Sequence, residues 1–326
     1  MPLVKKAPIV VTRDNLVPPY HDYVYFDDAT SNPFLPAVTG FEMVNAWWLA
    51  EVATLVYHVP DKVGSEFEKA GLRLLDPIQD QRTDTECFVA VGEKFAIVAF
   101  RGTETGLRRN DPDFRHIFLD LLTDAKLRLV PFGAGAGKVH NGFLAAYNSV
   151  EVRLQSALAG LDAGLPVWFT GHSLGAAIAT LAAARADRIQ GLYTYGSPRV
   201  GDVAFAQTFS RKFAGMGGDR HFRFVHDNDV VTVVPPNGLY RHVGSLKHIN
   251  SDGRISDDPT ALALLSDTFR DLANMAVGLL RVPLGDRKQR EARLLELFIE
   301  GIIDHVPTRY ARRIWNAYVE ERGGGD

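Results

Sequence analysis

Residues 167–186 of this chain have the sequence VWFTGHSLGAAIATLAAARA. A short apolar run, a glycine-flanked serine and an alanine-rich run predict a strand, a tight turn and a helix. Gly171 and Gly175 have no Cβ, so strand and helix can approach closely around Ser173. We expect this serine to take a strained backbone conformation. Its hydroxyl would then be exposed at the helix N-terminus, where negative charge is favoured.

This arrangement is typical of the nucleophile in an α/β-hydrolase fold. The pentapeptide 171–175 is a weak signal alone, and a buried structural turn is the alternative interpretation. Predicted strands and helices alternate along the chain, which indicates a mostly parallel central sheet with helices on both faces. The strands are expected at 86–92, 95–100, 166–170, 191–195 and 222–225, with a hairpin turn at 92–94, and the helices at 41–58, 143–158, 176–186, 202–213 and 291–303. The helix at 41–58 should be amphipathic, with Trp47 and Trp48 in the core.

Length and composition fit a single domain over residues 1–326, with an irregular N-terminal arm at 1–40. Apolar residues make up 46% and charged residues 23%, which is ordinary for a globular enzyme with a large core. The net charge of −3 gives no indication of a nucleic-acid partner. No run approaches the roughly 18 apolar residues of a membrane span.

Cys87 is the one cysteine, so an intrachain disulfide cannot form. It lies in an apolar segment, and we expect a buried, inert thiol. The N-terminus carries Lys5 and Lys6 without a continuous apolar run after them, so a secretory signal is not predicted. The expected location is cytoplasmic or leaderless, and secretion remains open for a chain from which a signal peptide was removed.

A nucleophilic serine needs a base, and the base needs an acid that orients it. In α/β-hydrolases the acid follows the serine and the histidine comes last. The polar run 226–229 follows a predicted strand, so it would lie at the carboxyl end of the sheet, where sites gather. Both Asp227 and Asp229 are candidates for the acid, and Asp227 is alternatively a loop-capping carboxylate.

Three histidines follow this run, His242, His248 and His305. His305 comes just after a predicted helix, where a loop can hold it over the sheet, and it is the preferred base. His248 lies in a polar stretch and is either the base or a surface residue. His172, next to the nucleophile, is expected to pack or to shape the substrate pocket rather than to act as the base.

The reaction also needs donors for the developing oxyanion, each typically worth about 3 kcal/mol. The backbone N–H of Leu174, directly after the nucleophile, should be one donor. Thr103 should supply the other, because a predicted strand ends at Phe100 and Gly102 allows the turn.

With these residues in place, the chain resembles the class 3 lipase family, which includes the filamentous-fungal triacylglycerol lipases. The similarity extends from about Asn45 to Tyr310, most of the chain. The resemblance favours Asp229 over Asp227 because of the residues that follow Asp229. The motifs that carry it are 99–103 (AFRGT), 139–143 (VHNGF), 170–176 (TGHSLGA), 194–201 (TYGSPRVG), 228–231 (NDVV) before 235–236 (PP), and 304–305 (DH) with Tyr310.

By this resemblance Ser173, Asp229 and His305 form the triad, and Thr103 and Leu174 line the oxyanion hole. It also implies a lid at about 104–118, here longer or differently hinged than in the family. Residues 261–280 form either a second cover or a helix packed on the sheet. The secreted fungal members carry disulfides that one cysteine cannot form, so the resemblance points to an intracellular or bacterial branch.

The sequence therefore predicts a serine carboxylic-ester hydrolase, a triacylglycerol lipase or esterase that acts through an acyl-enzyme at Ser173. No metal or organic cofactor is required. The substrate would be a lipid or another ester, met at a lipid–water interface. The alternatives are a phospholipase A1, an esterase for short or aromatic acyl groups, and a catalytically inactive hydrolase-fold binding protein. The acyl-chain preference and the oligomeric state stay open.

Overall fold

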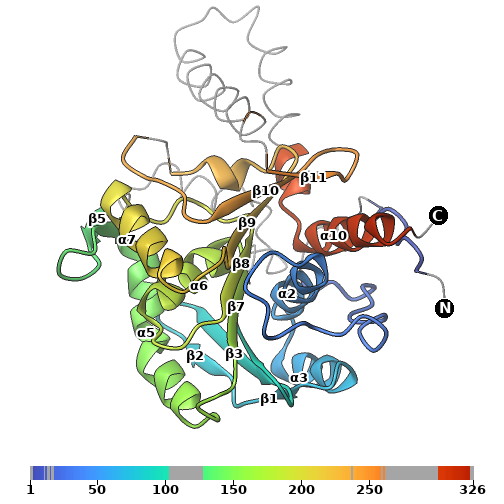
Figure 1. Cartoon of the computed structure of the whole chain (residues 1–326), viewed down its shortest axis with the longest axis horizontal. Helices are drawn as coiled ribbons and strands as arrows, with labels where there is room; N and C mark the ends of the chain where they lie inside the picture. Colours follow the sequence, from blue (N-terminus) through green and yellow to red (C-terminus); the bar gives the residue numbers. More distant parts are fainter. Residues whose placement is uncertain are drawn as a thin grey trace, which may run out of the picture.

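A nine-stranded sheet forms the centre of the part of the chain that the structure describes (Figure 1). The structure is a computed structural model. It describes residues 3–10, 12, 15, 18–102, 128–235, 238–257, 260 and 300–323. The strand order is β1-β3-β4-β7-β8-β9-β10-β11, and β2 pairs with β3. The strands are β1 (Arg73–Leu74), β2 (Ile78–Asp80), β3 (Thr85–Val91), β4 (Ala96–Phe100), β7 (Val167–His172), β8 (Gly191–Tyr195), β9 (His221–His226), β10 (Ser245–Ile249) and β11 (Ile255–Ser256).

The middle of this sheet is parallel, from β4 through β7, β8 and β9 to β10. The antiparallel pairs lie toward its two edges and include β3–β4 and β10–β11. The hairpin predicted at 92–94 is confirmed: Gly92 N donates to Phe95 O at 2.8 Å between β3 and β4. Outside the main sheet, β5 (Leu129–Pro131) and β6 (Lys138–His140) form a separate antiparallel pair.

Helices cover both faces of the sheet, as predicted (Figure 1). On one face lie α2 (Met43–Leu55), α3 (Pro60–Lys69) and α10 (Pro307–Glu321), and on the other lie α5 (Asn141–Ala159), α6 (Leu174–Arg185) and α7 (Val203–Ala214). Alternation along the strands explains this division. In β4, Ile97 and Ala99 belong to the core under α2, while Val98 and Phe100 belong to the core under α6.

Helix α2 is the most deeply buried element on its face. All thirteen of its residues are buried, so the predicted helix is confirmed but its predicted amphipathic character is wrong. The physical reason is that α10 packs on the side of α2 away from the sheet, and Trp315 packs against Trp47 with ring centroids 4.6 Å apart. Trp47 and Trp48 are core residues, as expected.

The N-terminal arm follows α10 rather than extending away from the fold. Lys6 N donates to Asn316 Oδ1 at 2.8 Å, and Asn316 Nδ2 donates back to Lys6 O at 3.0 Å. The two ends of the described chain therefore lie on the same side of the molecule (Figure 1). The predicted lid at 104–118 and the predicted cover at 261–280 lie outside the described residues.

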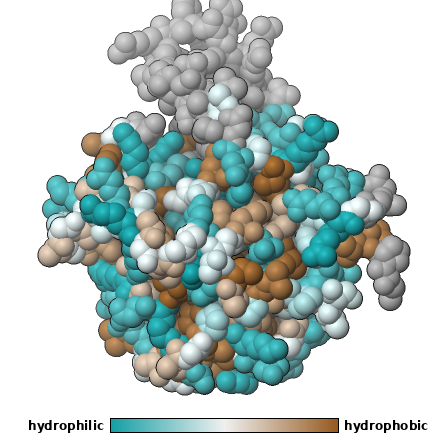
Figure 2. Space-filling model, viewed as in Figure 1, coloured by the Kyte–Doolittle hydropathy of each residue, from teal (hydrophilic) through white to brown (hydrophobic). Residues whose placement is uncertain are grey.

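On the face shown in Figure 2, hydrophilic and hydrophobic residues are interspersed. None of the described helices has the length and apolar character needed to cross a membrane. Cys87 is fully buried in β3, and burial raises the pKa of its thiol far above the usual range, as expected for an inert thiol.

Candidate active site

Ser173 occupies the sharp turn between β7 and α6. Its backbone has φ 59° and ψ −128°, a conformation that costs a non-glycine residue on the order of 1–3 kcal/mol. Two sets of backbone hydrogen bonds hold it there. Ser173 N donates to Tyr195 O at 3.0 Å, and Ser173 O accepts from Ala176 N at 3.0 Å. The strained turn that the sequence predicts is therefore present.

The glycines on either side of the serine allow three backbone segments to meet. A Cβ on Gly171 would lie 2.4 Å from Gly175 O, which blocks the approach of strand and helix. A Cβ on Gly175 would lie 2.1 Å from Phe100 O, at the end of β4. The missing side chains thus bring the start of α6 against both β7 and the segment after β4, where Gly102 lies.

Asp229 and His305 form a buried pair close to this turn. Asp229 follows β9 and is completely buried, and His305 precedes α10 and is 4% exposed. The Nδ1 atom of His305 lies 2.8 Å from Asp229 Oδ2 and 3.0 Å from Oδ1. A carboxylate only accepts hydrogen bonds, so Nδ1 carries a proton in this contact. In the neutral ring Nε2 is then the atom that can accept a proton.

Two further donors fix the carboxylate of Asp229. Val231 N donates to Oδ1 at 2.9 Å, and Tyr310 Oη donates to Oδ2 at 2.6 Å. Burial and the charge of Asp229 raise the pKa of Tyr310 well above its usual value, so its hydroxyl remains a donor. Tyr310 belongs to a motif in the sequence, but nothing in the sequence assigns it this contact.

Gly196, the residue after β8, packs directly against the pair. Its φ is +57°, and a Cβ there would lie 2.8 Å from Asp229 Oδ2 and 2.9 Å from His305 Nδ1. The sequence motif 194–201 contains this glycine without indicating why it is needed. The contact shows that any side chain at this position would displace the acid or the base.

The alternative acid and base lie elsewhere. Asp227 has φ 40°, and its N donates to Ile249 O at 2.7 Å. His248 is on β10, is 7% exposed and donates through Nε2 to Asp227 O at 3.4 Å. His248 is therefore not a surface residue, because β10 is an inner strand of the sheet. In the described contacts, neither residue is hydrogen-bonded to Asp229 or His305.

His242, the remaining histidine after the acid, is also engaged away from the pair. Its Nε2 contacts Thr232 O at 2.7 Å. Burial and the nearby guanidinium groups of Arg223 and Arg199 lower its pKa well below the usual value. This histidine is held neutral and donates to a backbone carbonyl.

His172 links the nucleophile strand to the base. Its Nε2 lies 2.6 Å from His305 O and its Nδ1 lies 2.9 Å from Tyr57 Oη. A carbonyl only accepts, so Nε2 carries the proton and Nδ1 accepts from the tyrosine. Burial and the neighbouring His305 lower the pKa of His172 well below its usual value. The described contacts support packing, and contact with substrate stays a prediction.

Tyr57 is a residue that the sequence does not indicate. It lies just after α2, and its hydroxyl also stands 2.1 Å from the place where a Cβ on Gly102 would be. A glycine is needed at 102 so that the segment after β4 can lie against Tyr57. A partner 115 residues from His172 leaves no local pattern in the sequence.

The expected oxyanion donors are described only in part. Leu174 is the first residue of α6, where backbone N–H groups have no partner within the helix. Thr103 lies outside the described residues, and Gly102 is the last residue described before it. The geometry at Leu174 is consistent with a donor beside Ser173, and the role of Thr103 stays a prediction.

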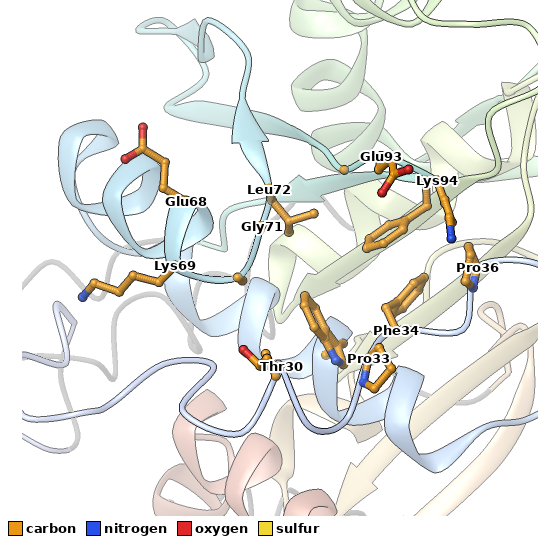
Figure 3. Close-up of a pocket in the computed structure, with 15 residues that line it drawn as sticks. Thr30, Pro33, Phe34, Pro36, Glu68, Lys69, Gly71, Leu72, Glu93 and Lys94 are labelled. Carbon is orange, nitrogen blue, oxygen red and sulfur yellow. The ribbon is translucent and has the colours of Figure 1, made fainter.

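A cavity of about 640 Å³ lies away from these residues, between the N-terminal arm, α3 and the β3–β4 hairpin (Figure 3). Phe34 and Leu72 extend into it, while Lys69 is directed away. Residues 92–95 line it just before β4 begins, whereas Ser173 follows the end of the parallel strand β7. Five residues of strand separate these ends by roughly 16 Å. The cavity is therefore separate from Ser173 and from the Asp229–His305 pair.

Comparison with known proteins finds similar sequences and a matching family. Residues 97–239 match the family described as lipase (class 3). A secreted mono- and diacylglycerol lipase of Fusarium solani is 40% identical over 116 residues, which is 33% of each chain. A chloroplastic phospholipase A(1) of Arabidopsis thaliana is 34% identical over 172 residues, covering 47% of this chain and 36% of its own. This chain thus spans about a third of the length of these two relatives.

Among solved structures, the triacylglyceride lipase of Rhizomucor miehei has 26% sequence identity and a TM-score of 0.52. The alignment covers 64% of this chain and 80% of that chain. This likeness and the observed strand order confirm the α/β-hydrolase fold that the sequence predicts.

Proposed function

We propose that this chain, whose residues 97–239 match the lipase (class 3) family, is a serine carboxylic-ester hydrolase. Its substrates would be acylglycerols or related lipid esters, met at a lipid–water interface. The main support is the buried Asp229–His305 hydrogen bond of 2.8 Å in a fold that also holds Ser173 in a strained turn. A relative named as a mono- and diacylglycerol lipase supports the choice of glycerides.

The reaction begins when Ser173 Oγ attacks the ester carbonyl carbon and its proton passes to His305 Nε2. Asp229 holds the ring with Nδ1 protonated and stabilises its positive charge. The N–H of Leu174, with Thr103 as the second donor, stabilises the oxyanion of the tetrahedral intermediate. The intermediate collapses, the alcohol leaves with the proton from His305, and an acyl-enzyme remains. Water then repeats the sequence and releases the acid.

We propose further that the chain forms one domain with a lid at about 104–118, and that segment 261–280 is either a second cover or a helix packed on the sheet. The arm, α2 and α10 share one core with the sheet, which supports the single domain. A second candidate activity is that of a phospholipase A1, which the Arabidopsis thaliana relative favours. The two activities share the same triad and differ in the lipid that reaches it.

Hydrolysis of p-nitrophenyl esters by purified wild-type and Ser173→Ala protein tests the proposal. Removal of a serine nucleophile is expected to lower kcat by about 10⁵–10⁶-fold. Ser149→Ala is a matched control, because Ser149 lies on α5 and bonds Thr83 and Ala146 far from the pair. Undiminished hydrolysis by Ser173→Ala would refute the proposal.

A panel of lipids then separates the candidate activities. Monoacylglycerol, triacylglycerol emulsion and phosphatidylcholine vesicles are compared at equal ester concentration, with short soluble esters alongside. Preference for the acylglycerols supports the first candidate. Release of fatty acid mainly from phosphatidylcholine supports the phospholipase, and preference for the short esters supports a simple esterase.

A further inference from the structure

Asp304, the residue before His305, makes contacts that the proposed reaction does not use. It is 8% exposed. Its Oδ2 accepts from Asn228 N at 3.3 Å, and its Oδ1 accepts from Arg309 Nη1 at 3.1 Å. Its backbone oxygen accepts from His226 Nδ1 at 2.9 Å. One residue therefore contacts the end of β9, the turn after it and α10.

These contacts join two segments that are far apart in the chain. The acid segment is residues 226–229 and the base segment is residues 304–305, and Asp229 and His305 are 76 positions apart in the chain. Asn228 directly precedes Asp229, and Asp304 directly precedes His305. We call two contacts tethers: Asn228 N to Asp304 Oδ2, and His226 Nδ1 to Asp304 O. Both end on Asp304, one residue from His305. Two tethers beside the direct Asp229–His305 bond restrict how the two segments rotate relative to each other.

The surroundings of Asp304 make its charge unfavourable for the fold. Burial, and then the nearby charge of Asp227, raise the pKa of Asp304 to about 6, although Asn228 N and Arg309 act in the opposite direction. Asp229 adds repulsion, and His226, which faces it, is kept neutral mainly because burial lowers its pKa to about 4. Around Asp227, in turn, lie His248, Arg313 and Asp252.

A raised carboxyl pKa has a definite consequence for stability. The folded state prefers the protonated form, so this contribution is complete below the unfolded value near 3.9 and is lost as pH rises through about 6. Above that pH the chain keeps an ionised carboxylate that lowers its stability. An ionised group has the stronger hydrogen bonds to Asn228 N and Arg309, so the charge favours tight registration of the two segments.

We propose that Asp304 is a positioning residue for the ester hydrolysis proposed above, and that its carboxylate holds the Asp229 turn and the His305 segment in register. The proposal rests on the proposed function for its effect on rate. It makes Asp304 act through Asp229 and His305, without contact to the substrate.

Asp304→Asn keeps the shape of the side chain but removes its charge and one acceptor. At pH 8 we expect kcat to fall about tenfold with KM within twofold of wild type, since small misplacements of catalytic groups cost one to two orders of magnitude. Asp252→Asn is the matched control, because Asp252 is exposed and lies near Asp227. This substitution removes the same charge without changing Asp304. That variant should keep the wild-type kcat.

Thermal unfolding gives a second signature. The Tm of Asp304→Asn minus the Tm of wild type should increase as pH rises from 4 to 7, because only the wild type then acquires the buried charge. A variant that gains relative stability while it loses kcat separates positioning from a structural role.

The NMR signal of the proton between His305 Nδ1 and Asp229 gives a third readout, which is sought far downfield. This signal should broaden or shift in Asp304→Asn and stay unchanged in Asp252→Asn.

The outcomes are distinct. Wild-type kcat together with an unchanged downfield proton in Asp304→Asn overturns the proposal, whatever happens to Tm. If the wild type hydrolyses no ester and yet the proton broadens in Asp304→Asn alone, the proposed function fails while the registration by Asp304 is supported. Loss of kcat with the pH-dependent gain in relative Tm supports both.

Discussion

The two ends of the central sheet bury different kinds of residue. At the carboxyl end of the parallel strands, the structure buries Asp229, His305 and Asp304 and holds Ser173 at a positive φ. At the amino end of β4, aromatic rings pack against one another: Phe34 lies 4.5 Å from Phe95 and 6.0 Å from Trp48 between centroids. The charged residues Glu68, Lys69, Glu93 and Lys94 are among those that line the cavity beside these rings (Figure 3).

This difference shows how one sheet separates chemistry from stability. Buried titratable groups and strained backbone lower stability and need a fold that tolerates them. Packed aromatic rings at the other end add stability and carry no reactive group. Substitutions at the carboxyl end should therefore change the rate of hydrolysis more than stability, and substitutions at the amino end should do the reverse.

Among the variants that keep Ser173, the largest effect is expected from Asp229→Asn. The amide cannot stabilise the charged imidazole and favours the wrong tautomer, so kcat/KM for a p-nitrophenyl ester should fall by about 10³–10⁴-fold. Asp227→Asn, tested beside it, should lower kcat/KM by less than tenfold. A greater loss in Asp227→Asn than in Asp229→Asn would reverse the assignment of the acid.

Gly196→Ala comes next. Its methyl group would meet Asp229 Oδ2 at 2.8 Å and His305 Nδ1 at 2.9 Å, so the pair must move and kcat/KM should fall about 100-fold. Gly135→Ala is the matched control, because Gly135 has φ +71° with nothing within 4 Å of the added Cβ. Both variants carry backbone strain of about 1–2 kcal/mol, measured by denaturant unfolding. Equal kcat/KM in the two would show that Gly196 matters for its backbone alone.

Tyr310→Phe tests the third partner of Asp229. Loss of the 2.6 Å hydrogen bond to Oδ2 should lower kcat/KM about tenfold, since bonds to charged groups contribute about 1.5–3 kcal/mol. Tyr193→Phe removes a buried hydroxyl that accepts from Glu42 N, away from the pair. It should lower stability by about 1 kcal/mol and leave kcat/KM within twofold. Steady-state kinetics with chemical denaturation of both variants separates the two effects.

The smallest effect on rate is expected at the amino end. Phe34→Leu loses ring contacts with Trp48 and Phe95, so the free energy of unfolding should fall by about 1–2 kcal/mol. The kcat/KM of the folded protein should stay within twofold of wild type. A large loss of kcat/KM without loss of stability would mean that the two ends of the sheet are coupled.

The local features of the site could be predicted from the sequence because they depend on neighbouring residues. The turn at Ser173, the flanking glycines and the hairpin at 92–94 each arise within a few residues. The full burial of α2 was not predictable, because it depends on α10, which begins about 250 residues later.

The residues that contact Asp229, His305 and His172 could be identified only in the folded structure, for the same reason. Tyr57 meets His172 across 115 residues, and Asp304 meets Asn228 across 76. Gly196 is in a visible motif, but its contact with Asp229 depends on how β8 and β9 lie side by side. Residue types at such positions indicate that something is needed there without indicating what they touch.

Covalent labelling tests the central claim, that Ser173 is the nucleophile, most directly. Wild-type protein and Ser173→Ala are incubated with a fluorophosphonate, and the adduct is located by intact mass and peptide mapping. We predict one adduct in the wild type, on the peptide that contains Ser173, and none in Ser173→Ala. An adduct on another residue, or full ester hydrolysis by a protein that forms no adduct at Ser173, would contradict the account.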